Sequence, residues 1–454
     1  MKILFISILI FCFFPKPLYG QQINDKKLIE FGWDYPNVDY LKANIYEMEK
    51  NTPFDGVVFS FQSDPYYAFD TDRLSSNYLK FDDLSKIQWH KFTDNFIFIW
   101  GVGKSGPHWT EDDSWIKIID NLTRISKAIE ISHSKGIVFD PEFYLANPLL
   151  NPWIYNKESY PQLSYEQVGE FVKKRGIQFI QALQTSKPDV KVLCFWLWEL
   201  VAKQNRTQPI INTAMALYPF FIEGMLEGKN KESQLIDGNE TGYWYTNAID
   251  FITSAGEERA NAKKFLPPFL WSKIDKITFA QPLFYDGIFA LKPAFDRGYD
   301  KETQNRLFRN NLYYALQTTD RYVWLYSEQL NWWKKPDEVV VAKIITGVKN
   351  KADNNIHNIQ EKTSGHSSFE TLSGEDHSDP GFNFNYSVQK RTLFISNLKK
   401  GTKTINIYAN SRLIRSVKNP LSDTSFTFTK QQSKKNIIVV DKDTNNQFSI
   451  AFVN

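Results

Sequence analysis

Carboxylates recur beside aromatic side chains wherever an apolar run of this sequence gives way to a loop. The sharpest instance is Asp140 and Glu142, which follow the apolar run 136–139 and precede Tyr144. Side chains two residues apart at the end of a strand point the same way, so both carboxylates can enter one cleft. Repulsion between them should keep one protonated, which predicts a general acid, Glu142, and a neighbour, Asp140, that orients it. The alternative is that Asp140 caps the next segment and Glu142 forms a surface ion pair.

A second group of acids, Asp237 and Glu240, follows a short apolar run and is surrounded by Gly, Tyr and Trp. Either acid could be the nucleophile or base that acts opposite Glu142. The alternative is an Asx-turn in which Asp237 binds its own backbone. Glu328 follows the apolar run 322–326 and could bind substrate hydroxyls or act with Glu142. Its alternative role is a salt bridge.

Two carboxylates that flank an acetal bond are the minimum for cleaving a glycosidic linkage, because one protonates the leaving oxygen while the other attacks or activates water. Aromatic faces beside them suit the C–H-lined faces of pyranose rings. The candidate substrate-binding residues share one property, which is a position at an expected strand end. They are Trp33, Asp34, Tyr144, Trp198, Glu199, Tyr243, Trp244, Asp286, Trp332 and Trp333. Asp34, Glu199 and Asp286 are isolated acids, for which a structural role is the alternative.

These side chains need elements that bring separate strand ends together, and the chain alternates accordingly. Short β-branched and aromatic runs are followed by longer segments with helical spacing, except that an inserted stretch rich in Asp and Tyr follows the second run. The expected strands cover 28–33, 57–61, 95–102, 136–139, 192–197, 235–236, 277–285 and 322–326. The expected helices cover 38–50, 114–135, 165–185, 215–226, 249–265, 301–317 and 339–348.

Eight such units within residues 21–352 predict an α/β fold, a (β/α)8 TIM barrel. The strands are apolar throughout, as parallel strands buried on both faces should be. An open doubly wound sheet is the alternative, but no Gly-rich dinucleotide-binding turn follows the first strand. In a barrel the loops after the strands form one face, so the acids at the strand ends would meet there.

The two ends of the chain differ in composition from the expected barrel. Residues 1–20 hold Lys2, the uncharged apolar run 3–14 and a small residue, Gly20, before a polar chain. This pattern predicts a cleavable signal peptide, too short to span a membrane, and therefore a secreted or periplasmic protein. Residues 353–380 are polar and aperiodic, which predicts a linker or surface excursion. Residues 381–454 alternate in short runs between turn residues, which predicts a small antiparallel β-sandwich.

Composition excludes several classes of function. The 454-residue chain has 54 basic and 51 acidic side chains, a net charge of +3, so it has no broad basic field for nucleic acid. Its six histidines are scattered, so we expect no metal site. A Gly-x-Ser-x-Gly elbow and a Walker-type phosphate loop are both missing, and we expect no cofactor. His108, in the loop after the third expected strand, could contact substrate; the alternative is a surface role. We expect a monomer whose partner is a carbohydrate.

The segment from Phe139 to Tyr144 and the barrel-plus-sandwich layout resemble the (β/α)8 glycoside hydrolases of the secreted bacterial type. Chitinase-like enzymes carry an Asp-x-Glu whose Glu is the acid, which would correspond to Asp140 and Glu142. In α-galactosidase-like barrels the carboxylates follow the fourth and sixth strands, which would pair Asp140 or Glu142 with Asp237 or Glu240. The resemblance implies hydrolysis of a poly- or oligosaccharide. The alternative is a non-catalytic glycan-binding protein that uses the same aromatic cleft.

Overall fold

The computed structural model describes residues 25–334 and 342–349 together with seven strands between residues 383 and 450. The expected signal peptide (1–20) and the expected linker (353–380) lie outside the described residues.

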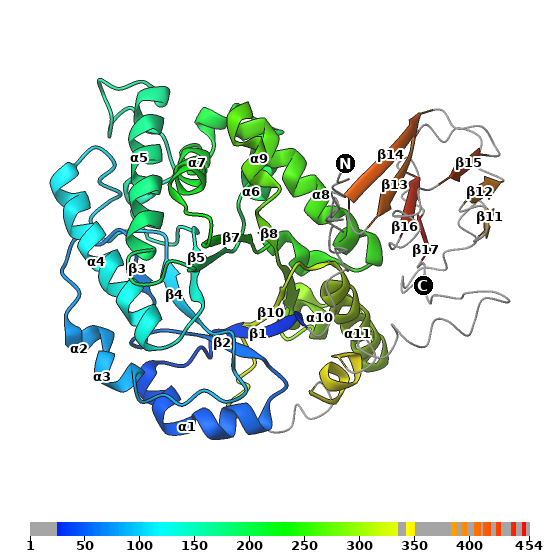
Figure 1. The fold of residues 1–454 in the computed structure, drawn as a ribbon, viewed down its shortest axis with the longest axis horizontal. Helices are drawn as coiled ribbons and strands as arrows, with labels where there is room; N and C mark the ends of the chain where they lie inside the picture. Colours follow the sequence, from blue (N-terminus) through cyan, green and yellow to red (C-terminus); the bar gives the residue numbers. More distant parts are fainter. Residues whose placement is uncertain are drawn as a thin grey trace, which may run out of the picture.

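Parallel strands form a ring at the centre of the molecule (Figure 1). They are β1 (Lys27–Gly32), β2 (Gly56–Phe59), β4 (Phe96–Trp100), β5 (Gly136–Asp140), β6 (Lys191–Cys194), β7 (Gln234–Asp237), β8 (Thr278–Phe279), β9 (Gln281–Phe284) and β10 (Tyr322–Ser327). Neighbours pair in the order β8-β7-β6-β5-β4-β2-β1-β10-β9, and the short β3 (Tyr66–Tyr67) adds to β4. Each strand expected from the sequence therefore takes part in the ring.

The ring closes through one interrupted strand. β8 pairs with β7 and β9 pairs with β10, and Ala280 alone separates β8 from β9. The N–H of Ala280 still donates to the carbonyl of Asp237 at 2.7 Å. Because β8 and β9 together occupy one position, the ring has eight strand positions. The α/β prediction of a TIM-type barrel is confirmed.

Helices cover the outside of the ring (Figure 1). The long ones are α1 (Val38–Asn51), α4 (Asp112–Ile131), α5 (Tyr165–Leu183), α7 (Tyr218–Gly228), α8 (Ala248–Phe265) and α11 (Lys301–Thr318), and a further helix spans 342–349. The short ones are α2 (Ser76–Leu79), α3 (Phe81–Leu84), α6 (Glu199–Asn205), α9 (Trp271–Ile274) and α10 (Tyr285–Phe289). The start of α5 shows the local cause: Ser164 and Gln167 form a capping box that satisfies its first free N–H groups.

Aromatic side chains fill the interior of the ring and show which residues point inward. Phe31 lies 5.0 Å from Phe98 and 5.4 Å from Phe195, ring centre to ring centre, and Phe195 stacks on Trp324 at 5.2 Å. Phe139 instead packs on Phe179 of α5, outside the ring. Since side chains alternate along a strand, these contacts fix the direction of every residue near a strand end.

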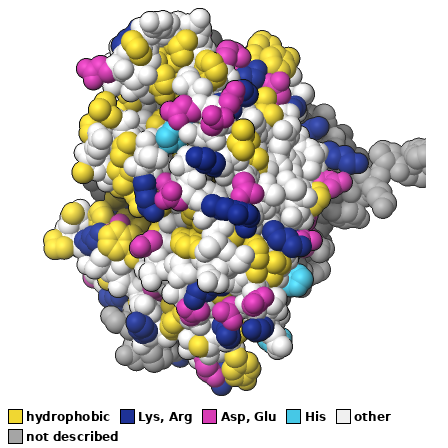
Figure 2. Space-filling model, turned by 90° about the vertical axis from the view of Figure 1, so that its left-hand side faces the viewer, with side chains coloured by type: hydrophobic (Ala, Val, Ile, Leu, Met, Phe, Trp, Pro, Cys, Tyr) yellow, Lys and Arg dark blue, Asp and Glu magenta, His cyan; other side chains and the backbone are white. Residues whose placement is uncertain are grey.

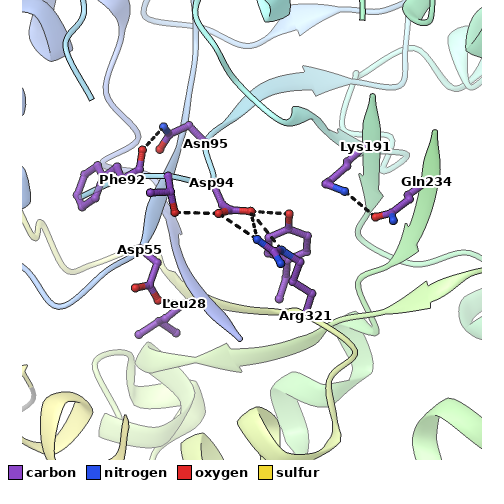
Figure 3. A network of polar contacts seen from close by, with 10 residues as sticks. Leu28, Asp55, Phe92, Asp94, Asn95, Lys191, Gln234 and Arg321 are labelled. Carbon is purple, nitrogen blue, oxygen red and sulfur yellow. Dashed lines mark hydrogen bonds and ion pairs between the residues drawn. The ribbon is translucent and has the colours of Figure 1, made fainter. Parts of the chain in front are cut away.

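A polar network ties together the amino ends of the strands (Figure 3). Asp94, just before β4, accepts hydrogen bonds from the hydroxyl of Tyr322 at 2.8 Å and from Arg321 at 3.1 Å, both at the start of β10. Burial opposes the ionisation of Asp94, but these hydrogen bonds and the guanidinium outweigh it, and the pKa of Asp94 is lowered. Beside it, Lys191 donates to Gln234 at 2.7 Å, which joins the first residues of β6 and β7.

The C-terminal strands form two antiparallel sheets. One contains β11 (Asn383–Ser387), β12 (Thr392–Ser396) and β15 (Thr424–Thr427). The other contains β14 (Arg412–Lys418), β13 (Thr404–Ala409), β16 (Ile437–Asp441) and β17 (Gln447–Ile450). The antiparallel pairing was expected, and the packing of the two sheets into a sandwich stays a prediction.

Charge is mixed on the face of the molecule shown in Figure 2, where Lys and Arg alternate with Asp and Glu. This pattern agrees with the near balance of charges in the sequence. Among the described residues, no helix combines the length and apolar character needed to cross a membrane.

Candidate active site at the carboxyl ends of the strands

Three carboxyl groups converge at the carboxyl ends of the strands, and we call Asp140, Glu142 and Glu240 the mouth carboxylates. Because Phe139 points outward, Asp140 at the end of β5 points into the ring. Its Oδ1 accepts a hydrogen bond from the N–H of Glu142 at 2.8 Å. Glu240 begins the 3-10 turn η4 (Glu240–Trp244) after β7, and its N–H donates to the carbonyl of Phe195 at 3.0 Å. The predicted Asp140–Glu142 pair therefore meets an acid from another strand.

The mouth carboxylates hold protons more tightly than ordinary carboxyl groups. Burial raises the pKa of Glu142 to about 7. Burial also raises the pKa of Glu240 well above its usual range, and repulsion from Glu142, Asp140 and Glu199 raises it further. Burial and the charge of Glu142 raise the pKa of Asp140 in the same way. Like charges this close cannot all ionise, so the group shares protons near neutral pH.

Two tyrosines complete the inner part of the site. Tyr243 stacks on Tyr326 with 5.4 Å between ring centres and an angle of 9°. The hydroxyl of Tyr243 is buried and has no hydrogen-bond partner among the described residues. Burial and the charges of Glu240 and Glu142 raise its pKa, so it stays protonated and is available as a donor. Tyr243 was expected at the site, whereas Tyr326 was missed because it lies within β10 and not after it.

Exposed aromatic residues surround the mouth carboxylates. Trp33, Tyr144 and Trp244 are 66%, 62% and 51% exposed, which is unusual for such large side chains. Near Trp33, the ammonium of Lys292 lies 5.5 Å from the ring centre and forms an ion pair with Glu328. Glu328 therefore has the salt bridge that was its alternative role. Each of the three rings still exposes more than half of its surface, which leaves room for a ligand to stack on it.

Asp237 lies behind the wall of the barrel and not in its mouth. It pairs in register with Cys194, which points outward because the next residue, Phe195, points inward. There Asp237 faces Trp198 and Glu258 across a cavity of about 10 Å³. Burial raises the pKa of Asp237 to about 7. Of the two sixth-strand candidates, only Glu240 accompanies Glu142.

Two other candidates share this region. Trp198 is 1% exposed and cannot stack on a ligand. Burial and the charge of Asp237 raise the pKa of Glu199 to about 8, and its Oε2 accepts a weak hydrogen bond from Thr241 at 3.4 Å. Glu199 thus lies beneath the loop that carries Glu240.

The remaining acidic candidates anchor the loop after β10. Asp286 is fully buried and accepts hydrogen bonds from the hydroxyl of Ser327 at 2.5 Å and from the N–H of Glu328 at 2.8 Å. Asp34 accepts a hydrogen bond from the N–H of Trp332 at 2.8 Å. Asp286 is therefore occupied by the loop after β10, whereas Asp34 binds it through one oxygen only; its Oδ1 is buried without a hydrogen-bond partner among the described residues, and burial raises the pKa of Asp34 to about 6.

The two tryptophans of this loop pack inward. Trp332 is 7% exposed and contacts Phe54 with 5.0 Å between ring centres. Trp333 is partly buried and donates its indole N–H to the carbonyl of Asp34 at 2.8 Å. They hold the loop and lie apart from the exposed aromatic rings.

The described residues contain no group of three or more His, Cys, Asp or Glu side chains that could hold a metal ion. The mouth carboxylates are held near one another by β5, β6 and η4, and a protonated tyrosine lies beside them. This arrangement provides one carboxyl group that can donate a proton and a second, from another strand, that can act as a nucleophile or base.

Strand order and strand-end acids place the chain in the class of (β/α)8 barrels with an acidic mouth. Its structure is similar to a GH5-4 broad specificity endoglucanase from an uncultured bacterium, with 10% identity and a TM-score of 0.40 over 68% of this chain and 84% of that one. PbGH5A, a glycoside hydrolase family 5 enzyme from Prevotella bryantii, gives 9% identity and a TM-score of 0.40 over 73% and 96%. The GH18 chitinase ChiB of Flavobacterium johnsoniae is 12% identical, with a TM-score of 0.32 over 72% of this chain and 94% of that one.

No family model matches the chain, and no curated protein matches its sequence. The structural similarities are too low in identity and TM-score to say what the protein does. Its chemistry has to come from its own side chains.

Proposed function

We propose that this protein is a glycoside hydrolase in which Glu142 is the general acid and Glu240 is the nucleophile or base. The observation that carries the proposal is the convergence of Glu142 and Glu240, from different strands, in a partly buried mouth where burial raises the pKa of both and the charge of Glu142 raises that of Glu240 further. Glycosidic bond cleavage needs two carboxyl groups with different protonation states on either side of the bond.

Glu142 supplies the proton. With a pKa of about 7 it is largely protonated in weakly acidic solution, so it can donate to the glycosidic oxygen as the C–O bond breaks. Asp140 fixes the backbone of Glu142 through the 2.8 Å hydrogen bond to its N–H. The leaving sugar departs as an alcohol, and the anomeric carbon is left electron-poor.

Glu240 acts on the anomeric carbon. Burial is the main cause of the raised pKa of Glu240, and the charge of Glu142 adds the largest repulsion; while Glu142 is neutral this repulsion is absent, which favours the ionised form of Glu240. The carboxylate can attack the anomeric carbon, and the glycosyl-enzyme is then hydrolysed by water that gives a proton to the ionised Glu142; alternatively Glu240 takes a proton from the water that attacks the anomeric carbon directly. The free hydroxyl of Tyr243 lies near both carboxylates and can stabilise the negative charge on Glu240.

The exposed aromatic rings around the mouth carboxylates support a carbohydrate substrate. Trp33, Tyr144 and Trp244 offer exposed rings to the C–H faces of sugar units, which favours a poly- or oligosaccharide. A non-catalytic glycan-binding protein would use the same rings. It would have no need for two partly buried acids, Glu142 and Glu240, close enough for the charge of one to raise the pKa of the other.

The test is a screen of the purified chain from residue 21 onward against a polysaccharide panel, with detection of new reducing ends. We expect at least one glycan to be cleaved by the wild type and by Glu130→Gln, a control on the exposed face of α4. Glu142→Gln and Glu240→Gln should each lose this cleavage. Glycan binding without cleavage would favour the binding alternative, and full cleavage by both variants would exclude the assignment.

Export, domain layout and oligomeric state extend this proposal. We propose that residues 1–20 are removed as a signal peptide and that the mature chain is a secreted or periplasmic monomer. The two C-terminal sheets would pack as a β-sandwich beside the barrel. Amino-terminal sequencing of the exported protein should begin at Gln21, and its mass by light scattering should be that of one chain.

A further inference from the structure

A second cavity, of about 210 Å³, lies between the loop that follows β4 and the loop that follows β5. Ser105, His108 and Glu111 line it on one side and Asn151 and Tyr160 on the other. None of the mouth carboxylates lines it, so it is separate from the proposed glycosidase site.

Three side chains of this cavity form a continuous hydrogen-bonded chain. The hydroxyl oxygen of Ser105 lies 3.0 Å from Nε2 of His108, and Nδ1 of His108 lies 2.8 Å from Oε2 of Glu111. A carboxylate on Nδ1 selects the neutral tautomer that carries its proton there, which leaves Nε2 free to accept the proton of Ser105. In serine hydrolases a hydroxyl nucleophile is hydrogen-bonded to a base, and the base is hydrogen-bonded in turn to an orienting acid.

The loop holds the three hydrogen-bonded side chains in place, and it does so with an unfavourable backbone conformation at His108. His108 has a φ of 52°, a left-handed conformation that is unfavourable for a residue with a side chain, and Gly106 has a φ of 118°. The hydroxyl of Ser114 donates to Glu111 at 2.8 Å. Burial opposes the ionisation of Glu111, but the hydrogen bonds from Ser114 and His108 outweigh it and lower its pKa. Glu111 therefore stays ionised and can orient the imidazole.

We propose that Ser105, His108 and Glu111 form a second hydrolytic site that cleaves carboxylic esters with a small acyl group. Ser105 Oγ attacks the carbonyl carbon while its proton passes to Nε2 of His108. The bond to the alcohol oxygen breaks, the alcohol leaves with the proton from His108, and an acyl-serine remains. Water, deprotonated by His108, then releases the carboxylic acid and restores Ser105.

Two features of the cavity fit this reaction. Among the described residues, no hydrogen bond uses the N–H of Gly106 or of His108, so the loop that carries Ser105 has two unpaired backbone donors that could bind an oxyanion. The volume of about 210 Å³ is below the usual size of small-molecule sites, which limits the acyl group to a few atoms.

The competing role is structural, because Glu111 precedes α4 and Ser114 lies in its first turn. The two roles differ in reactivity at Ser105. The probes are p-nitrophenyl acetate, whose hydrolysis is followed by absorbance, and a fluorophosphonate, whose attachment site is mapped by peptide mass spectrometry.

The wild type should hydrolyse the acetate and carry the label on Ser105. Ser105→Ala and His108→Asn should each lower kcat/KM by at least about 100-fold. The matched control Ser159→Ala, an exposed residue of the same cavity, should keep the wild-type rate. Glu142→Gln should also keep it, so loss of glycan cleavage and loss of ester cleavage are separable. An inactive wild type, an unchanged rate in Ser105→Ala or a label elsewhere would overturn the proposal.

Discussion

The two ends of the barrel use acidic side chains in opposite ways. At the amino ends of the strands, Asp94 is paired with Arg321 and Tyr322 and its pKa is lowered. At the carboxyl ends, Glu142 and Glu240 lie together partly buried, neither forms an ion pair within the described part of the chain, and their pKa values are raised. The same residue types therefore stabilise the fold at one end and are held ready to exchange protons at the other.

The difference shows where stability is given up for reactivity. A charged group that gains partners on folding contributes to the free energy of unfolding, whereas a carboxyl group buried among its like reduces it. In barrels the amino-end face is associated with stability and the carboxyl-end face with activity. The structure gives this division a physical cause in the pairing of charges.

Replacing a mouth carboxylate should have the largest effect on activity. We expect Glu142→Gln to lower kcat/KM for glycan hydrolysis by about 100- to 10,000-fold, because the general acid is lost. Its free energy of unfolding should stay level or rise, since a buried like charge is removed. Activated aryl glycosides, whose leaving group needs no proton, should be cleaved with a smaller loss by Glu142→Gln than by Glu240→Gln. Equal losses on both kinds of substrate would contradict the assigned roles.

Breaking the pair at the opposite end should cost stability and leave activity intact. Asp94→Asn removes the charge that Arg321 and Tyr322 bind, and we expect a free energy of unfolding lower by roughly 2–3 kcal/mol. Urea unfolding measures this change, with Asp120→Asn as the control. Asp120 forms an exposed ion pair with Arg124, for which we expect a change below about 1 kcal/mol. Loss of glycan cleavage by Asp94→Asn without a change in its free energy of unfolding would contradict the assignment of stability to the amino ends and activity to the carboxyl ends.

The pH dependence should separate the two ends by sign. Glu142 has a pKa raised from 4.5 to about 7, so the folded state binds more protons than the unfolded state in this window. Its contribution to the free energy of unfolding therefore decreases as pH rises from 4.5 to 7, by up to about 3 kcal/mol. Asp94, with a lowered pKa, contributes stability that is lost as pH falls below its usual value of 3.8.

Urea unfolding across this pH range checks both signs. Glu142→Gln should flatten the curve between pH 4.5 and 7, and Asp94→Asn should flatten it below pH 4. Glycan cleavage by the wild type should fall as pH rises through about 7, as Glu142 loses its proton. A rise in kcat/KM above pH 7 would contradict Glu142 as the acid.

Removing an exposed ring at the mouth should have the smallest effect. Trp33→Ala or Trp244→Ala should raise KM by about 2- to 10-fold with little change in kcat, since one aromatic contact to a sugar ring is lost. Stability should hardly change because both rings are mostly exposed. Phe269→Ala is the control, an equally exposed ring beside Lys173 of α5 on the outer helix layer. Equal effects of all three variants on KM would show that the mouth does not bind the glycan.

Sequence reasoning located the strands well and the direction of side chains less well. Strands buried on both faces read as plain apolar runs, so every expected strand has a counterpart in the ring. The same runs do not reveal which residues point inward. Asp237 and Glu240 looked alike, and only the register with Cys194 places Asp237 behind the wall.

Acids beside aromatic residues were also an incomplete signal. Asp34 and Asp286 share this pattern with Glu142, yet each accepts a backbone hydrogen bond from the loop after β10, although Oδ1 of Asp34 has no partner among the described residues. Their partners lie about 300 and 42 positions away along the chain, so local sequence could not reveal them. Tyr326 was missed for a related reason. It lies two residues after Trp324 on the same strand, so the two side chains point the same way, but only the structure shows that Trp324 points into the ring.

The pairing of β1 with β10 has a kinetic consequence. Lys27 and Tyr322 are register partners although almost the whole barrel lies between them in the chain. Every other neighbouring pair of the ring joins consecutive units, so the sheet can grow in order of synthesis while β1 keeps an unpaired edge. Closing a loop of roughly 300 residues costs about 5 kcal/mol in chain entropy, which the last strand must offset. The nascent protein therefore exposes an open sheet edge, a site of mispairing with other chains, until residues 322–327 have been made.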